Sequence, residues 1–151
     1  MAYCEMGAET PSIHQFLIPQ RATSDTIEEK PFLPSFIYFP LAEEIKTGIG
    51  TQNKPFCIGL YARERGAELT NRLISSAKSW LCYSGVDRKQ KLLPLASQSL
   101  SLEEISFKLS PLEAISELLN YLKEAWNEKM SEAPFDAQQI LITVPASFDP
   151  S

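Results

Sequence analysis

An apolar stripe with helical spacing runs between residues 111 and 130 and is the clearest pattern in the chain. The segment opens with Ser110-Pro111-Leu112-Glu113, in which the serine hydroxyl can accept the amide of the third helical residue. The glutamate can reach back to the serine amide, and proline is tolerated at the first helical position. The pattern predicts an amphipathic helix with one buried face. The stripe consists of Leu112, Ile115, Leu118, Leu119, Leu122, Ala125 and Trp126.

The last apolar run, ILITV at residues 140–144, predicts a buried strand. The run is rich in β-branched residues and lacks polar alternation, which suits a strand covered on both faces, as in a mostly parallel sheet. Pro145 ends the run because proline has no amide hydrogen for a sheet and fixes its own φ. A helix, a short loop and a buried strand form half of an α/β layer. We therefore predict an α/β fold with a mixed sheet and packed helices.

Shorter runs predict the elements of the first half. Residues 1–6 and 13–18 flank the turn-forming stretch 7–11, so they predict a hairpin. Residues 19–34 are polar and punctuated by proline, which indicates a surface loop.

Two more strands are expected in the middle of the chain, at residues 36–39 and 56–59. The polar, glycine-containing stretch 41–54 between them predicts a hairpin excursion. A short helix is expected at residues 60–69. A second helix is expected at residues 71–81, because apolar side chains recur there on one helical face.

Composition limits the class of protein and its partners. The chain has 151 residues, of which 44% are apolar and 22% charged, as in one globular domain. The net charge is −5 and the isoelectric point is near 4.9, with no basic cluster, which argues against nucleic acid and anionic membrane as partners. No apolar run approaches the ~20 residues that span a bilayer.

The cysteines and the first residues indicate a cytoplasmic protein. Three unclustered cysteines, Cys4, Cys57 and Cys82, fit buried thiols in a reducing compartment better than disulfides or a zinc site. The first ten residues lack the basic and apolar regions of a signal peptide. His14 is the only histidine, which excludes a histidine-based triad and a multi-histidine metal site.

Five segments carry motifs that follow one another in the order found in one known family. LPSFIYF resembles a T-P-S strand, although Leu33 replaces the usual threonine, and Gly59 with Ala62-Arg63 resembles a helix start of the form G-x-x-A-[KR]. SSAKSWL is similar to an A-K-S-W-L segment. SPLEAISELLNYLKEAW is similar to a helix that starts S-P-x-E, and ILITVPASFD is similar to a V-P-A-x-F segment. Together these motifs resemble the DnaK-type, seventy-kilodalton heat-shock chaperones, with the A-K-S-W-L form typical of divergent bacterial members.

This resemblance implies a fold and a role. The fold would be the early part of lobe I of an actin-like (ribonuclease H-like) ATPase domain, including its peripheral α/β subdomain. The parent protein would use ATP and Mg²⁺ to bind and release unfolded polypeptides, with co-chaperones as further partners. Lys78 matches the lysine that in the family points into the cleft, near the terminal phosphates and the attacking water. The alternative is that Lys78 is an ordinary solvated helix lysine.

The resemblance also implies a switch at Pro145, which in the family relays the nucleotide state together with an arginine shortly downstream. The alternative is a proline that simply ends a strand. The family's D-x-G-T phosphate hairpin does not occur in the sequence. The stretch most similar to this motif, Gly48-Ile49-Gly50-Thr51, lacks the acidic residue and is expected to be a hairpin turn.

These departures predict that residues 1–151 form a single, incomplete nucleotide-binding domain, without the first phosphate-binding hairpin and the second lobe. The remaining phosphate loop, the catalytic carboxylates and the adenosine site would lie beyond Ser151. We therefore expect the isolated chain to be inactive. A stand-alone, non-catalytic interaction module derived from the same fold is an alternative. An unrelated small α/β enzyme is another, but the sequence offers no matching set of acid, base and nucleophile for it. Cys82 near Lys78 could be an activated thiol, although a core cysteine is favoured.

Overall fold

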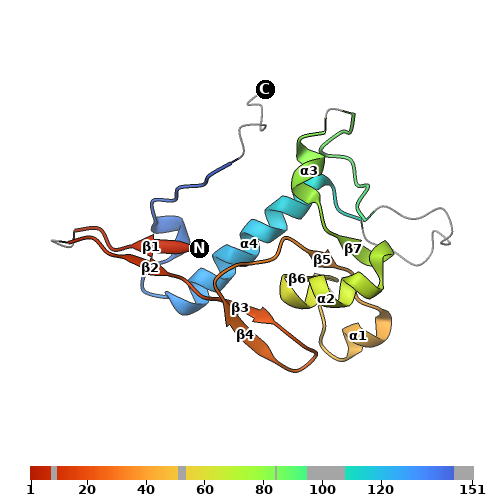
Figure 1. The fold of residues 1–151 in the computed structure, drawn as a ribbon, viewed down its shortest axis with the longest axis horizontal. Helices are drawn as coiled ribbons and strands as arrows, with labels where there is room; N and C mark the ends of the chain where they lie inside the picture. The colour runs from red at the N-terminus through yellow and green to blue at the C-terminus, as the bar shows by residue number, and fades with distance from the viewer. Residues whose placement is uncertain (8–9, 51–53, 84, 95–107, 145–151) are drawn as a thin grey trace.

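The computed structural model describes residues 1–7, 10–50, 54–83, 85–94 and 108–144. They form small β-sheets and helices along one long helix, α4 (Pro111–Lys129), so the fold is broadly α/β (Figure 1). All strand pairs in these ranges are antiparallel. The expectation of a mixed or mostly parallel sheet is therefore wrong for the described residues.

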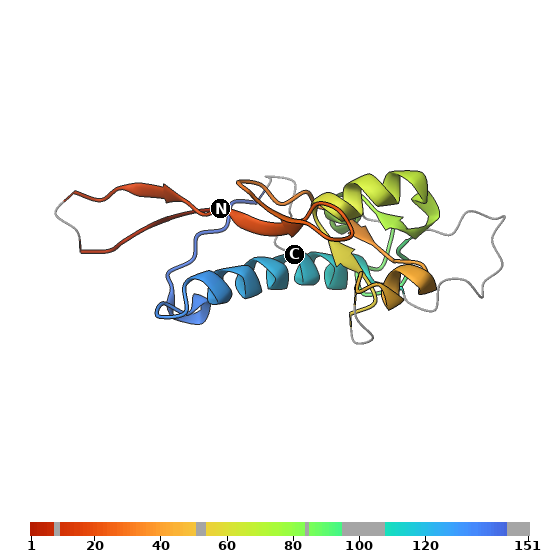
Figure 2. The same cartoon turned by 90° about the horizontal axis from the view of Figure 1, so that it is seen from below.

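The first hairpin confirms the prediction for the N-terminal residues. Strand β1 (Ala2–Cys4) pairs with β2 (Ile13–Gln15), and Tyr3 lies opposite His14. The hairpin extends away from the rest of the molecule (Figure 2). Its inner end is fixed by the amide of Phe16, which donates to the carbonyl of Met1 at 3.0 Å.

A second hairpin replaces the loop that was predicted for residues 19–34. Strand β3 (Ile18–Arg21) pairs antiparallel with β4 (Ile27–Lys30). The Ala22 amide closes the turn by donating to the carbonyl of Thr26 at 2.9 Å. The loop prediction failed because β4 is largely exposed and polar, so it has no apolar alternation from which a strand could be recognised.

A three-stranded sheet with the order β6-β5-β7 holds the centre of the fold. Strand β5 (Ile37–Tyr38) lies between β6 (Cys57–Ile58) and β7 (Leu73–Ile74). Helix α2 (Leu60–Glu68) follows β6 and packs against all three strands. The strands predicted near residues 36–39 and 56–59 and the helix predicted at 60–69 are thus confirmed.

The helix predicted over residues 71–81 is confirmed only for its last five residues and is wrong for the rest. This stretch contains the end of a 3-10 turn, η1 (Thr70–Arg72), then β7, then the short helix α3 (Ala77–Leu81). The Phe39 amide donates to the carbonyl of Arg72 at 2.9 Å, and Ile74 lies opposite Ile37 in the sheet. Long-range pairing with β5 therefore overrides the local helical pattern.

A helix also replaces the hairpin that was expected within residues 41–54. Helix α1 (Ala42–Lys46) begins after Leu41, whose amide donates to the Glu44 carboxylate at 2.8 Å. The sequence analysis did not recognise the capping function of Glu44, which closes the first turn of this helix.

Helix α4 has the predicted start. The amide of Glu113 donates to the Ser110 hydroxyl at 3.1 Å, and the Ser110 amide donates to the Glu113 carboxylate at 2.8 Å. The predicted stripe is wrong at Leu112 and Leu119, which are each 46% exposed. The buried residues of α4 do not follow the predicted stripe, because the helix contributes side chains to two separate apolar clusters. It contributes Ala114 and Leu118 to the first cluster, and Ala125 and Trp126 to the second.

The strand predicted at residues 140–144 is not formed. The chain leaves α4, makes a 3-10 turn, η2 (Phe135–Ala137), and continues without assigned secondary structure through Val144. The apolar side chains are exposed, and Leu141 is 91% accessible. No strand among the described residues pairs with this run, so its strand-forming sequence has no neighbour to bond.

Candidate functional site

Lys78 occupies an exposed position on α3. The preceding Ala77 is buried in the first apolar cluster, and Trp80 packs against the same cluster. Helix α3 also packs against α4, two of whose residues, Ala114 and Leu118, belong to the same cluster. The Lys78 side chain forms no ion pair or hydrogen bond with another described residue. The structure thus places a cation on the surface of an anchored helix.

The other motif positions supply no phosphate-binding loop within the described residues. Pro145, the expected switch residue, lies outside them, as does Thr51. Within the preceding glycine stretch, the Gly48 and Ile49 amides donate to the carbonyls of Ile45 and Glu44 at 3.1 and 3.0 Å. These amides close the C-terminal turn of α1 and cannot face a phosphate. The stretch is a turn, as expected, although it follows a helix rather than joining two strands.

The histidine and the cysteines do not form a site within the described part of the chain. His14 is exposed on β2, with its Nε2 2.7 Å from the Ser12 hydroxyl. Cys4 and Cys82 are exposed, so the expectation of buried thiols is wrong for both. Cys57 is partly buried, and burial raises the pKa of its thiol to about 12, so it does not fit an activated thiol. No described group of three His, Cys, Asp or Glu residues could hold a metal ion.

The strongest charged cluster has a structural role. Glu44 receives hydrogen bonds from Arg65 Nε at 2.6 Å, from the Tyr38 hydroxyl at 2.7 Å and from the Leu41 amide. Burial acts to raise the pKa of Glu44, but these three donors outweigh it and lower the pKa overall. Burial and the neighbouring carboxylate raise the pKa of Tyr38. Because the donors are already engaged, the cluster ties α1, β5 and α2 together.

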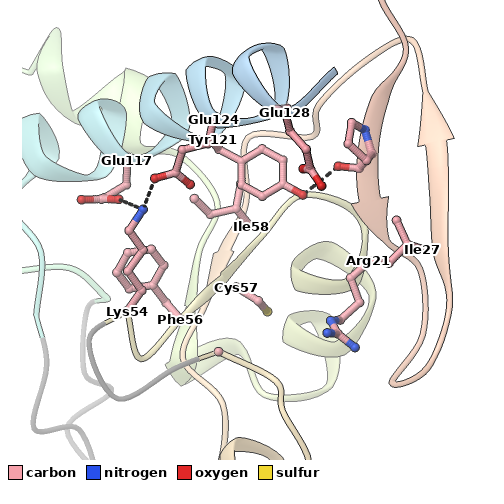
Figure 3. Close-up of a pocket in the computed structure, with 13 residues that line it drawn as sticks. Arg21, Ile27, Lys54, Phe56, Cys57, Ile58, Glu117, Tyr121, Glu124 and Glu128 are labelled. Carbon is pink, nitrogen blue, oxygen red and sulfur yellow. Dashed lines mark hydrogen bonds and ion pairs between the residues drawn. The ribbon is translucent and has the colours of Figure 1, made fainter. Parts of the chain in front are cut away.

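A pocket of about 360 Å³ lies between α4, the β3–β4 hairpin and β6 (Figure 3). Its walls include the apolar side chains of Phe56, Ile58 and Ala125. Tyr121 also lines it and is held in place by its hydroxyl, which donates to the Pro19 carbonyl at 2.8 Å. The volume falls in the range typical of small-ligand sites.

Carboxylates from α4 line one side of this pocket, and sequence reasoning missed their shared position. Glu117, Tyr121, Glu124 and Glu128 recur at four-, three- and four-residue spacing, which places them on one helical face. The helical pattern predicted only one buried apolar face, and these glutamates lie outside that stripe. The spacing was visible in the sequence, but the facing wall comes from distant segments.

Comparisons of the chain with family models, with curated proteins and with solved structures find no match. Among the helices that the structure describes, none combines the length and the apolar character needed to cross a bilayer.

Proposed function

We propose that these residues form an early part of lobe I of the actin-like ATPase domain of a DnaK-type chaperone. The parent protein would couple ATP hydrolysis to binding and release of unfolded polypeptides, with Mg²⁺ as cofactor and with co-chaperones as partners. The observation that carries the proposal is the ordered series of family-like motifs between Leu33 and Asp149. Residues 1–151 would then supply mostly the peripheral subdomain of that lobe.

The placement of Ala77 and Lys78 supports this proposal. The alanine is buried and the lysine is exposed, so the helix is anchored on one side while a cation is presented on the other. Phosphoryl transfer accumulates negative charge on the transferred group, and a fixed cation stabilises that charge. Lys78 would have this role once the rest of the cleft is present.

We further propose that the 151 residues alone do not hydrolyse ATP. The family's D-x-G-T phosphate hairpin does not occur in the sequence, and the amides of Gly48 and Ile49, in the stretch most similar to it, are engaged inside the α1 turn.

The function is tested by replacing Lys78 with alanine in a protein that contains these residues within a whole ATPase domain. We expect ATP turnover to fall by about 10²–10³-fold, because the charge on the transferring phosphoryl group loses a fixed cation. Stability should change by less than ~0.5 kcal/mol, because the side chain is exposed. Turnover is measured by phosphate release, and stability by urea unfolding.

The matched control for this experiment is Lys89→Ala, which removes an exposed lysine from the charged turn after α3. It should leave turnover unchanged, and the 151 residues assayed in parallel should release no phosphate. Equal turnover in Lys78→Ala and in the unmodified domain would contradict the cleft role. Activity of the 151 residues that is lost in Lys78→Ala would contradict the proposed inactivity.

A second candidate is a stand-alone interaction module with the same fold and no catalysis. The exposed apolar run at residues 140–144 favours it, because contiguous exposed apolar side chains mark interaction surfaces. A monodisperse chain that unfolds cooperatively without nucleotide would support the module. Aggregation through unpaired strand edges would count against it.

A further inference from the structure

The pocket beside α4 has an apolar interior formed by three separate parts of the chain. Phe56 and Ile58 come from the β6 segment, Tyr121 and Ala125 from α4, and Ile27 from β4 (Figure 3). Ile27 is exposed although it lines the pocket, so the protein leaves part of this apolar side chain uncovered. A ligand body that covers this surface would be stabilised by the hydrophobic effect.

The charged groups of the pocket leave it negative. Lys54 Nζ lies 2.7 Å from Glu124 Oε1 and 3.9 Å from Glu117 Oε2, so the pocket already accommodates one ammonium group between two carboxylates. Glu128 forms no ion pair or hydrogen bond with another described residue. The guanidinium of Arg21 donates to the carbonyls of Ser24 and Gly48, on the side of the pocket away from α4 (Figure 3). Two cations against three carboxylates leave one negative charge.

The carboxylate of Glu117 adds to the negative character of the α4 wall. Its Oε2 is buried and receives no hydrogen bond from the described residues, while the nearest ammonium, that of Lys54, is 3.9 Å away. A carboxylate whose charge is only partly compensated favours a cation over an anion in the pocket.

We propose that this pocket binds a small amphipathic amine, with its apolar body against Phe56, Ile58 and Tyr121 and its ammonium group at the carboxylates of Glu124 and Glu128. An acid of the same shape is disfavoured because α4 presents three carboxylates to the pocket. The inference does not depend on the proposed ATPase. Tyr121 and Glu124 lie in the segment 110–126 that resembles the family's S-P-x-E helix, but the resemblance assigns no role to either residue.

The test is an NMR titration of the 151-residue chain with 2-phenylethylammonium, with phenylacetate as the probe of opposite charge. We expect saturable shifts of the amides of Ile58, Tyr121 and Ala125, with a dissociation constant of about 1 mM, as befits a small ligand. Phenylacetate should bind at least about threefold more weakly.

Two pairs of variants separate the charged contact from the apolar one. Glu128→Gln should weaken amine binding by about threefold, whereas Glu132→Gln, which removes an exposed carboxylate beyond α4, should not. Ile27→Ser should weaken binding of both probes, and Ile13→Ser, at a similarly exposed isoleucine outside the pocket, should weaken neither. Absence of saturable shifts at the lining residues, equal binding of phenylacetate, or equal effects within either pair would overturn the proposal.

Discussion

Replacing Trp126 with alanine is expected to lower the free energy of unfolding by about 3–5 kcal/mol. The side chain is only 5% exposed and lies at the centre of the second apolar cluster. Its ring centroid is 5.4 Å from that of Tyr3, 5.3 Å from that of Phe16 and 6.3 Å from that of Phe135. Its Nε1 donates to the Ala133 carbonyl at 2.7 Å. The change therefore leaves a cavity and an unpaired carbonyl together.

Urea unfolding followed by far-ultraviolet circular dichroism measures this loss without relying on tryptophan emission. Leu119→Ala is the control, because Leu119 lies on the same helix but is 46% exposed. We expect the control to cost less than about 1 kcal/mol. A loss in Trp126→Ala no larger than in Leu119→Ala would show that the second cluster does not stabilise the fold.

The second large effect is expected for Gly59→Ala, which should cost about 2–4 kcal/mol. Gly59 has φ of +90°, a conformation that residues with a Cβ rarely adopt. An added Cβ would lie 2.7 Å from Gln20 Oε1 and 2.9 Å from Leu33 Cδ1. Gln20 is fully buried, donates to the Phe32 carbonyl at 2.8 Å and accepts from the Leu60 amide at 3.2 Å. The substitution would therefore strain the backbone and displace a buried hydrogen-bond junction.

Gly7→Ala separates the two causes. Gly7 has nearly the same φ, +92°, but a Cβ added there would meet no atom within 4 Å, so only the backbone strain remains. We expect this control to cost about 1 kcal/mol. Equal losses in both variants, measured by urea unfolding, would contradict the importance of the Gln20 junction.

Local signals in the sequence were sufficient where the chain makes its own contacts. The Ser110 and Glu113 side chains cap α4 as their spacing predicted, and the first hairpin follows its turn residues. Strand β7 could not be predicted, because Leu73 and Ile74 are strand residues only beside β5. Exposed β4 was missed for the opposite reason, since its side chains face water and leave no apolar pattern.

The candidate sites likewise combine features that the local sequence predicts with features that depend on tertiary packing. The exposure of Lys78 follows from its place beside buried Ala77, but its proposed role came only from the family resemblance. The pocket was missed because Phe56 and Tyr121 are 65 residues apart in the sequence and meet only through tertiary packing. A helical face rich in glutamate indicates solvent exposure until the opposite wall is known.

The apolar run at residues 140–144 joins the fold to the proposed function. Its sequence predicts a strand, yet its side chains are exposed and no described strand lies beside it. A strand of lobe I would have a strand-forming sequence and still be exposed and unpaired here, if its neighbouring strands belonged to other parts of the parent domain. Membership in the chaperone ATPase family would therefore explain why residues 140–144 have the sequence of a strand but form no strand in the described structure.

The most direct measurement of that membership is the nucleotide sequence on both sides of the codons for residues 1–151. The account predicts an in-frame D-x-G-T motif upstream, and downstream an arginine shortly after Pro145 followed by the second phosphate loop. Flanking sequence that encodes neither the upstream motif nor the downstream pair would contradict the assignment to the chaperone ATPase family.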